Sequence, residues 1–250
     1  MTEYEQILVD RRGGVATIRL NRPDALNAIT PTMLGELNGA LDALNADSEI
    51  HVAVLTGEGR AFSAGVDLKA LGDRELTGGS VGDILDIPAR AATHTLSEGR
   101  LVSIAQVNGF CFTGALELAM ACDLMVCADE AKLADTHAKF GLRPTWGLSA
   151  RLPALVGIAK ARELSYTART ISGSEAAAIG LACRSVPLDQ LGTTVAEIAE
   201  QIVATSTGSR GAYKDLYRDG RAGDIAAGLE YEAATAYEIG DTEERLAAFR

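Results

Sequence analysis

The feature that most constrains the fold of this chain is a repeated order of strand-like runs and helical runs. The first two strand-like runs lie on either side of Gly13 and Gly14, which predicts a β-hairpin. Thr30 and Pro31 then begin a segment with apolar residues three and four positions apart, which predicts a helix capped by Thr30. Residues 51–57 form the next short apolar run. Strands that alternate with helices in this way predict an α/β fold.

The character of the chain changes towards its C-terminus. After residue 140, short helical segments follow one another, separated by Gly and Pro residues. From about residue 189, nearly the whole sequence is rich in Ala and Glu and is typical of helix. We therefore predict a core over residues 1–188 and a helical C-terminal region over residues 189–250.

Composition and charge argue against several classes of protein. The chain has 250 residues, 47% of them hydrophobic, which is enough for one sizeable core. A formal net charge of -11 argues against a nucleic-acid-binding protein, because such a protein needs a basic face. No apolar run approaches the roughly 20 residues that cross a bilayer, and the N-terminus lacks the apolar segment of a signal peptide. We expect a cytoplasmic protein that binds neither nucleic acid nor membrane.

The spacing of cysteines and histidines predicts no metal site. The three histidines show neither HxxxH nor HExxH spacing, and no two cysteines form a CxxC pair. Reduced cysteines are typical of a cytoplasmic core. The cysteines interpreted in this way are Cys111, Cys122, Cys127 and Cys183.

Small residues crowd two places where a strand hands over to a helix. Residues 61–68, AFSAGVDL, follow one apolar strand and precede a polar segment that is typical of helix. Residues 107–126, VNGFCFTGALELAMACDLMV, repeat this form, with Thr113 and Gly114 at the start of the helix. Such a turn either permits close packing or aims the first helical amides at a ligand oxygen. Two turns of the second kind supply converging amides, which is the geometry of an oxyanion hole.

Glu117 and Asp123 carry the only charges between residues 110 and 126. Asp123 lies where the helix should give way to the next strand, and we interpret it as structural. Glu117 lies one turn into the helix, with leucine on both sides. A buried carboxylate without a partner is costly, so Glu117 either has a partner or is used for its altered protonation. The sequence leaves both alternatives open.

In this order and spacing, the segments resemble the crotonase superfamily, the enoyl-CoA hydratase/isomerase family. The resemblance covers nearly the whole chain. It runs from VATIRLNRPDALNAI through GRAFSAGVDLKAL and VNGFCFTGALELAMACDL to ADTHAKFGLRPTWGLSARLP. It implies a spiral of β-β-α turns and a helical C-terminal region that builds trimers, often paired into hexamers. It also implies an acyl-CoA thioester as substrate, with no cofactor apart from the CoA that the substrate carries.

The resemblance assigns roles to particular positions of this chain. It implies that the backbone amides of Val66 and Gly114 hold the thioester oxygen, and that Glu117 is the helix acid of the family. Lys69 is placed to offset phosphate charge. The positions that match the family's CoA-contacting segments are Arg22, Ala25, Leu26, Ala64, Val66, Asp67, Leu68 and Lys69.

Two departures from the family pattern fall near the expected reaction centre. Hydratases of the family carry a second glutamate 20 residues after the first, but this chain has His137 there. Their Pro-Gly-x-Gly-Gly loop is replaced by residues 144–148, PTWGL. A neutral imidazole at His137 is a competent base near pH 7, so a pair of Glu117 and His137 is one way to hydrate. Alternatively, Glu117 moves a proton alone and His137 only packs beside the acyl chain. Asp135 is either a loop residue or orients His137.

These alternatives leave several functions to compare. An enoyl-CoA hydratase-like lyase accounts for both turns and for Glu117. An enoyl-CoA isomerase, or another crotonase-type reaction such as thioester hydrolysis, decarboxylation or C–C cleavage, accounts for a single glutamate. A non-catalytic acyl-CoA-binding protein leaves Glu117 without a role. We therefore favour the hydratase-like enzyme.

Five further residues are secondary candidates. His94 lies in a helix that, by resemblance, borders the acyl pocket. Trp146, the only tryptophan, is either a packing anchor or narrows that pocket. Tyr213, Lys214 and Tyr237 are candidates for contact with the CoA of a neighbouring subunit.

Overall fold

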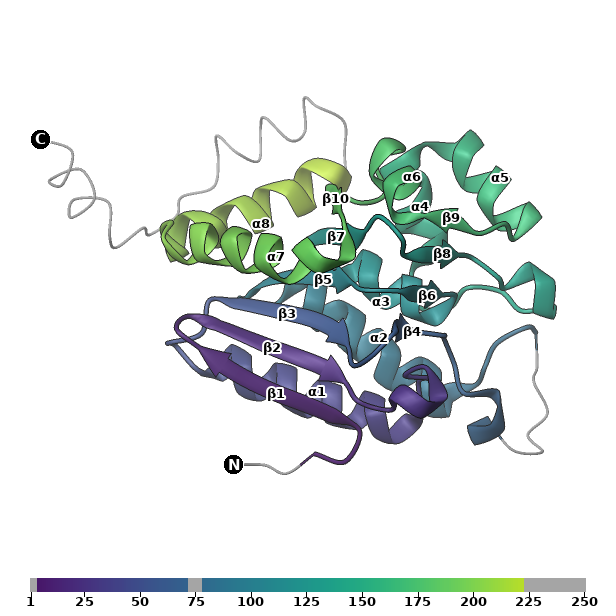
Figure 1. The fold of residues 1–250 in the computed structure, drawn as a ribbon, viewed down its shortest axis with the longest axis horizontal. Helices are drawn as coiled ribbons and strands as arrows, with labels where there is room; N and C mark the ends of the chain where they lie inside the picture. The colour runs from purple at the N-terminus through teal and green to yellow at the C-terminus, as the bar shows by residue number, and fades with distance from the viewer. Residues whose placement is uncertain (1–3, 72–77, 223–250) are drawn as a thin grey trace, which may run out of the picture.

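The computed structural model describes residues 4–71 and 78–222, which form two β-sheets enclosed by helices (Figure 1). The larger sheet begins with the predicted hairpin, an antiparallel pair, and continues with parallel strands in the order β1-β2-β3-β5-β7-β10. Its strands are β1 (Ile7–Arg12), β2 (Val15–Leu20), β3 (Val52–Gly57), β5 (Val102–Val107), β7 (Leu124–Ala128) and β10 (Arg184–Val186).

The smaller sheet lies beside the larger one and has the order β4-β6-β8-β9 (Figure 1). Its first three strands are mutually parallel, and the last is antiparallel to its neighbour. Its strands are β4 (Ala61–Ser63), β6 (Phe110–Phe112), β8 (Lys132–Ala134) and β9 (Ile171–Ser172).

The connections make the chain a spiral. Strand β3 leads into β4, β5 into β6 and β7 into β8, so each turn adds one strand to each sheet. A helical segment then returns the chain to the larger sheet for the next turn. This arrangement confirms the prediction of an α/β fold built from β-β-α turns.

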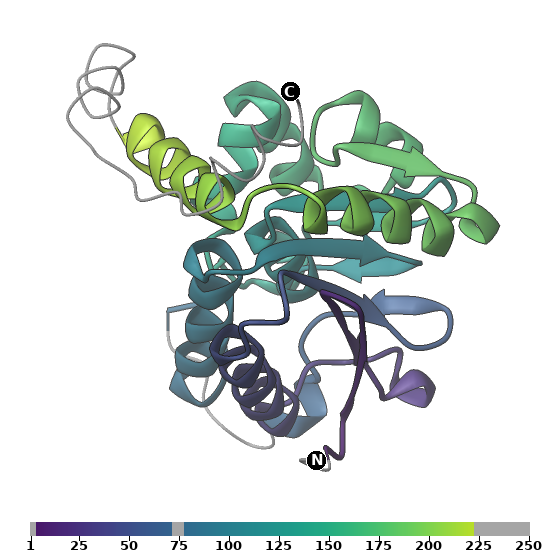
Figure 2. The same cartoon turned by 90° about the vertical axis from the view of Figure 1, so that its left-hand side faces the viewer.

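Helices cover both faces of the larger sheet (Figure 2). Helix α1 packs on β1 and β2, and α2 and α3 pack on β5, whereas α7 crosses the opposite face. The capping prediction for Thr30 is confirmed, because its hydroxyl accepts a hydrogen bond from the Met33 amide at 3.1 Å. The helices named here are α1 (Pro31–Ala46), α2 (Asp83–Glu98), α3 (Gly114–Ala121) and α7 (Leu188–Val203).

Shorter helices surround the smaller sheet and complete the fold. Helices α4 and α5 follow β8, and α6 separates β9 from β10. These shorter helices are α4 (Leu148–Val156), α5 (Ile158–Thr167) and α6 (Gly173–Ala178), whereas the longer α8 (Thr207–Ala222) follows α7. The 3-10 helices are η1 (Pro23–Ala25), η2 (Leu68–Leu71) and η3 (Ala138–Phe140).

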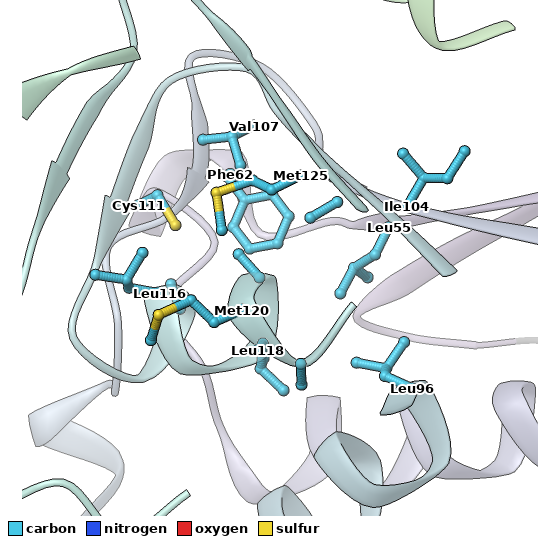
Figure 3. Packing of buried hydrophobic residues seen from close by; sticks show 14 of the residues in the cluster. Leu55, Phe62, Leu96, Ile104, Val107, Cys111, Leu116, Leu118, Met120 and Met125 are labelled. Atoms are coloured by element: carbon cyan, nitrogen blue, oxygen red, sulfur yellow. The ribbon is translucent and has the colours of Figure 1, made fainter. Parts of the chain in front are cut away.

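Helix α3 runs through the centre of the core (Figure 3). All eight of its residues are buried, so it presents apolar side chains on every side. Leu116, Leu118 and Met120 pack among side chains from the strands and from α2. Glu117 is therefore a carboxylate carried into the interior on an otherwise apolar helix.

Two predictions about local structure were wrong in detail. Residues 61–63 and 110–112 form β4 and β6, whereas the sequence indicated them only as parts of the two turns between strand and helix. Three residues are too few to show the alternation by which a strand is recognised. The polar segment after AFSAGVDL begins as the 3-10 helix η2, and residues 72–77 lie outside the described residues.

The described part of the predicted C-terminal region is helical. It consists of α7 and α8, and residues 223–250, Tyr237 among them, lie outside the described residues. Helix α7 buries Leu191, Val195 and Ala199 against the larger sheet. Over residues 4–71 and 78–222, no helix is both long enough and apolar enough to cross a membrane.

Candidate active site

The two small-residue turns meet at one edge of the smaller sheet. Strands β4 and β6 are parallel neighbours, so the turns that follow them leave the sheet at the same end. Gly65 has a φ of +93°, and a Cβ at this position would lie 2.8 Å from the carbonyl oxygen of Phe112. Only glycine permits both the backbone angle and this approach. The glycine of AFSAGVDL therefore brings the first turn against the second.

The Val66 amide faces the space beyond the two turns. The Ile29 amide donates to Gly65 O at 2.8 Å, and the Asp67 amide donates to Ile29 O at 2.9 Å. This parallel bridge uses the groups on either side of Val66, so the Val66 N–H points away from Ile29. Within residues 4–71 and 78–222, the Val66 amide has no protein acceptor.

The Gly114 amide is the counterpart on the second turn. Gly114 is the first residue of α3, where an N–H has no partner within the helix. Because η2 is only a short 3-10 turn, the positive end of an α-helix dipole lies at Gly114 and not at Val66. Among the described residues the Gly114 amide also has no acceptor, so two free amides border the same edge.

Thr113 holds the second turn in an unusual conformation. Its φ of 54° and ψ of -112° are rare for a β-branched residue and cost on the order of 1–3 kcal/mol. The turn is held by the Thr113 amide, which donates to Ala134 O at 2.9 Å, and by the paired hydroxyls of Thr113 and Thr136. Backbone strain of this kind clusters at functional sites. This strain was not predictable from the sequence, because threonine is not a residue expected at positive φ.

Glu117 has hydrogen-bond partners although its side chain is only 1% exposed. Its Oε1 atom accepts from the Trp146 amide at 2.9 Å and from the Leu148 amide at 3.0 Å. Its Oε2 atom lies 3.5 Å from Nε2 of His137. The buried carboxylate of Glu117 therefore has partners, as the first of the two alternatives required. These partners are backbone amides of the 144–148 loop, which departs from the family pattern.

His137 lies between two carboxylates. Its Nδ1 atom is 2.7 Å from Oδ1 of Asp135, which also accepts from the His137 amide at 3.1 Å. Asp135 and His137 are 3% and 6% exposed, so the row of Asp135, His137 and Glu117 is buried. Of the two alternatives for Asp135, a loop residue or a residue that orients His137, the contacts favour the second.

The environment of His137 favours its cationic form. Burial alone lowers the pKa of this imidazole, but the hydrogen bonds and charges of Asp135 and Glu117 outweigh it and raise the pKa to about 9. For Asp135, burial raises the pKa, and the hydrogen bonds from His137 and Ser165 outweigh it and lower the pKa overall. This environment argues against the neutral imidazole base that the sequence offered as one alternative near pH 7. A protonated imidazole can donate a proton, and a carboxylate beside it can accept one.

The two segments proposed to contact CoA lie side by side. The Ala64 amide donates to Leu26 O at 2.9 Å, and the Arg22 guanidinium forms an ion pair with Asp67 at 3.0 Å. The Arg22 Nη1 atom also donates to Ala28 O at 2.6 Å, so this charge is engaged within the protein. The remaining members of the set are Ala25, at the end of η1, Val66, already described, and exposed Leu68 and Lys69 on η2.

The secondary candidates fall into different places. His94 is exposed on α2 and lines a surface hollow of about 280 Å³ together with Thr145 and Trp146. Tyr213 is exposed on α8, but Nζ of Lys214 forms a 3.0 Å ion pair with Asp123. Lys214 also donates to two backbone carbonyls of its own chain, so the structure gives it a role within the subunit.

The sequence analysis missed one polar residue of this region, Asp86 on α2. It is 4% exposed, and its carboxylate accepts hydrogen bonds from Thr145 and Trp146, which lie about 60 residues later in the chain. No local pattern marks such a long-range contact. Over the ranges that the structure covers, no cluster of three or more His, Cys, Asp or Glu side chains is arranged to hold a metal ion.

Comparisons with known proteins identify the class of this fold and site. The model of the enoyl-CoA hydratase/isomerase family matches residues 10–249. A protein of Arabidopsis thaliana named "Probable enoyl-CoA hydratase 1, peroxisomal" is 37% identical, over 94% of this chain and 87% of its own. The crystal structure of an enoyl-CoA hydratase from Bacillus anthracis has a TM-score of 0.89 at 32% identity, covering 98% of this chain and 96% of that one.

A third match comes from a structure that contains CoA. A Thermobifida fusca protein, named "a putative enoyl-CoA hydratase" and solved in complex with CoA, has a TM-score of 0.83 at 30% identity. The match covers 98% of this chain and 94% of that one. The chain belongs to the enoyl-CoA hydratase/isomerase family. More particularly, it is an enoyl-CoA hydratase-like enzyme of the crotonase fold.

Proposed function

We propose that this enzyme adds water to the double bond of a 2-enoyl-CoA, with Glu117 as base and His137 as acid. The observation that carries this proposal is the buried row of Asp135, His137 and Glu117, in which an imidazole with a pKa of about 9 lies 3.5 Å from a carboxylate. Hydration needs a base for water and an acid for the α-carbon, and this pair supplies one of each. The free amides of Val66 and Gly114 lie at the same edge of the fold.

The reaction then proceeds through an enolate. The thioester oxygen accepts hydrogen bonds from the amides of Val66 and Gly114, which stabilise negative charge as it develops. Glu117 removes a proton from water while the water oxygen bonds to the β-carbon, and the π electrons move onto the thioester oxygen. His137 then donates its proton to the α-carbon, which restores the thioester carbonyl. The products are a 3-hydroxyacyl-CoA, a protonated Glu117 and a neutral His137.

The contact between the two groups returns them to their starting state. Oε2 of Glu117 and Nε2 of His137 lie 3.5 Å apart, so the proton taken from water passes directly from Glu117 to His137. Asp135 holds the ring by its other nitrogen, which keeps Nε2 directed at Glu117. No cofactor is assigned a step in this mechanism, because all proton transfers use side chains of the chain itself and CoA is part of the substrate.

Two further parts of the proposal concern where CoA binds and where in the cell the enzyme is found. The paired segments around Leu26 and Ala64 are proposed to receive CoA, which the CoA complex of the Thermobifida fusca relative supports. We also propose a cytoplasmic location, in keeping with the four free cysteines, of which Cys111 and Cys127 are buried.

A panel assay tests the proposed reaction. The purified enzyme is given crotonyl-CoA and a 3-enoyl-CoA, and products are separated by chromatography. We expect 3-hydroxybutyryl-CoA from the first substrate. If only the double bond of the 3-enoyl-CoA moves, the enzyme is an isomerase that uses Glu117 alone. If CoA binds in calorimetry but neither substrate reacts, the chain is a binding protein or catalyses another reaction.

The pH dependence of activity should report on His137. Because the acid form is active and its pKa is raised to about 9, kcat/KM should stay high below that pH and fall as pH rises through it. Asp135→Asn removes one of the anions that raise the pKa, so the alkaline limb should move to lower pH. Asp42→Asn, on the exposed face of α1, is the control and should leave the limb in place. An unmoved limb in Asp135→Asn would contradict the role of His137 as the acid.

We further propose that the enzyme is a homotrimer or a dimer of trimers. This proposal depends on the family membership and on the helical C-terminal region, where Tyr213 and Tyr217 are exposed at 57% and 66% on α8. Large aromatic side chains that project from one helix are typical of a surface that another subunit covers. Multi-angle light scattering should give three or six times the subunit mass of 26.1 kDa at micromolar concentration. A stable monomer would contradict this assembly.

A further inference from the structure

Asp86 is a buried carboxylate that lies outside the row of Asp135, His137 and Glu117. It lies on α2, is 4% exposed and has Oδ1 within 2.8 Å of Trp146 Nε1 and 2.7 Å of Thr145 Oγ1. The Ser80 hydroxyl donates to its other oxygen. Burial raises the pKa of this carboxyl, but the hydrogen bonds of Ser80, Thr145 and Trp146, together with the charge of Arg90, lower it overall. A buried anion with three donors therefore faces the loop between η3 and α4.

Trp146 connects this anion to the reaction centre. Its indole N–H donates to Asp86, and its backbone N–H donates to Oε1 of Glu117 at 2.9 Å. Its ring also lies against Gly114, where an added Cβ would come within 2.5 Å of a ring carbon. One residue thus contacts Asp86, the base and the helix start that carries a free amide.

The other side of Trp146 is also held, so the position of its backbone is fixed from two directions. The Arg151 guanidinium donates to Trp146 O at 3.0 Å. Gly147 has a φ of +115° and turns the chain into α4, which places the Leu148 amide on Glu117 as well. Among the described residues, Asp86 is the only carboxylate that accepts hydrogen bonds from the side chains of Thr145 and Trp146.

We propose that Asp86 is a positioning residue that holds the Trp146 loop, and through it the carboxylate of Glu117 and the start of α3. The inference rests on the proposed function, since it concerns the geometry of the same site. Its physical basis is that an indole N–H bonded to a buried anion is held more strongly than one bonded to a neutral group. Loss of the anion frees the ring, and the Trp146 amide moves away from Glu117.

The central variant is Asp86→Asn, which keeps the size of the side chain and removes its charge. We expect kcat to fall about 10-fold or more, as for other residues that orient a reacting group, while KM changes less than about twofold. Asp83→Asn is the matched control, because it makes the same change at an exposed position of α2 and should behave as wild type.

Fluorescence gives a second readout that does not depend on activity. Trp146 is the only tryptophan of the chain, so its emission reports directly on the indole beside Asp86. We expect the emission maximum and quantum yield to change in Asp86→Asn and to stay unchanged in Asp83→Asn. Thr145→Val removes one donor to Asp86 and leaves the charge, so a smaller change of both readouts is expected. This milder variant also serves if Asp86→Asn does not fold.

A double-mutant cycle separates positioning from general destabilisation. Trp146→Phe keeps a ring against Gly114 and loses the N–H that binds Asp86. If Asp86 acts through that N–H, the double variant Asp86→Asn/Trp146→Phe should lose less kcat than the two single losses multiplied. Fully multiplicative losses, or native kcat and native emission in Asp86→Asn, would overturn the proposal.

The same measurements distinguish this inference from the proposed function. The kcat ratios are taken on whichever panel substrate the wild type converts, so an isomerase would fail the hydration assay and still show the Asp86 effect. If no substrate is converted, the emission of Trp146 in Asp86→Asn decides the inference by itself. Unchanged emission would then overturn it.

Discussion

Replacement of Glu117 by glutamine is expected to lower turnover of crotonyl-CoA by at least about 10²-fold, the usual effect of losing a general acid or base. Glutamine keeps the shape of the side chain and an oxygen that accepts from the Trp146 and Leu148 amides. It cannot take a proton from water. The loss should therefore appear in kcat, measured by steady-state kinetics, with CoA affinity in calorimetry little changed.

The control for this variant is Glu49→Gln, at an exposed position after α1. It makes the same chemical change and should retain wild-type kinetics. Full activity in Glu117→Gln would show that the chemistry lies elsewhere in the molecule.

The second large effect is expected at His137. His137→Gln keeps a polar side chain of similar size but removes the titratable proton, and we expect kcat to fall by a factor comparable to that of Glu117→Gln, about 10² or more. His137→Ala should cost at least as much, because it also leaves the carboxylates of Asp135 and Glu117 buried without their shared partner. Thermal unfolding of both variants separates the loss of stability from the loss of catalysis.

The kinetics of the His137 variants decide whether Glu117 acts together with His137 or moves a proton alone. If Glu117 moves a proton between carbons alone, substitution of His137 should mainly change substrate affinity and chain-length preference. Nearly full kcat in His137→Gln would therefore contradict a shared mechanism, while leaving the role of Glu117 intact.

The prediction of the two turns from sequence succeeded because small residues in a sequence mark places where another segment comes close. Gly65 and Gly114 each fill a place where a side chain would collide with another segment, and small residues mark such places directly. The hairpin around Gly13 and the capped helix after Thr30 were predictable because turn and cap chemistry lie within a few residues. The sequence did not predict which residues contact one another elsewhere in the site.

What the sequence did not show depends on contacts between distant segments. Asp86 and Trp146 are 60 residues apart, and nothing near either residue predicts that they meet. The protonation of His137 also needed the structure, because a histidine pKa is set by the groups that surround it. Asp135 is only two residues away, yet its effect depends on both side chains turning towards each other.

The proposed site requires a particular arrangement of the thioester in any acyl-CoA complex. The amides of Val66 and Gly114 must hold the same oxygen, and that oxygen must belong to the thioester whose neighbouring carbons face Glu117 and His137. The relative from Thermobifida fusca shows that a CoA complex of this fold can be obtained by crystallography.

The measurement that tests the account most directly is therefore a crystal structure of this enzyme with a bound acyl-CoA. We expect the thioester oxygen to lie within about 2.7–3.2 Å of both the Val66 and the Gly114 amide nitrogens, the range of a normal hydrogen bond. The α- and β-carbons should then face His137 and Glu117. A thioester oxygen more than about 4 Å from both amides would contradict the account, because no hydrogen bond spans that distance.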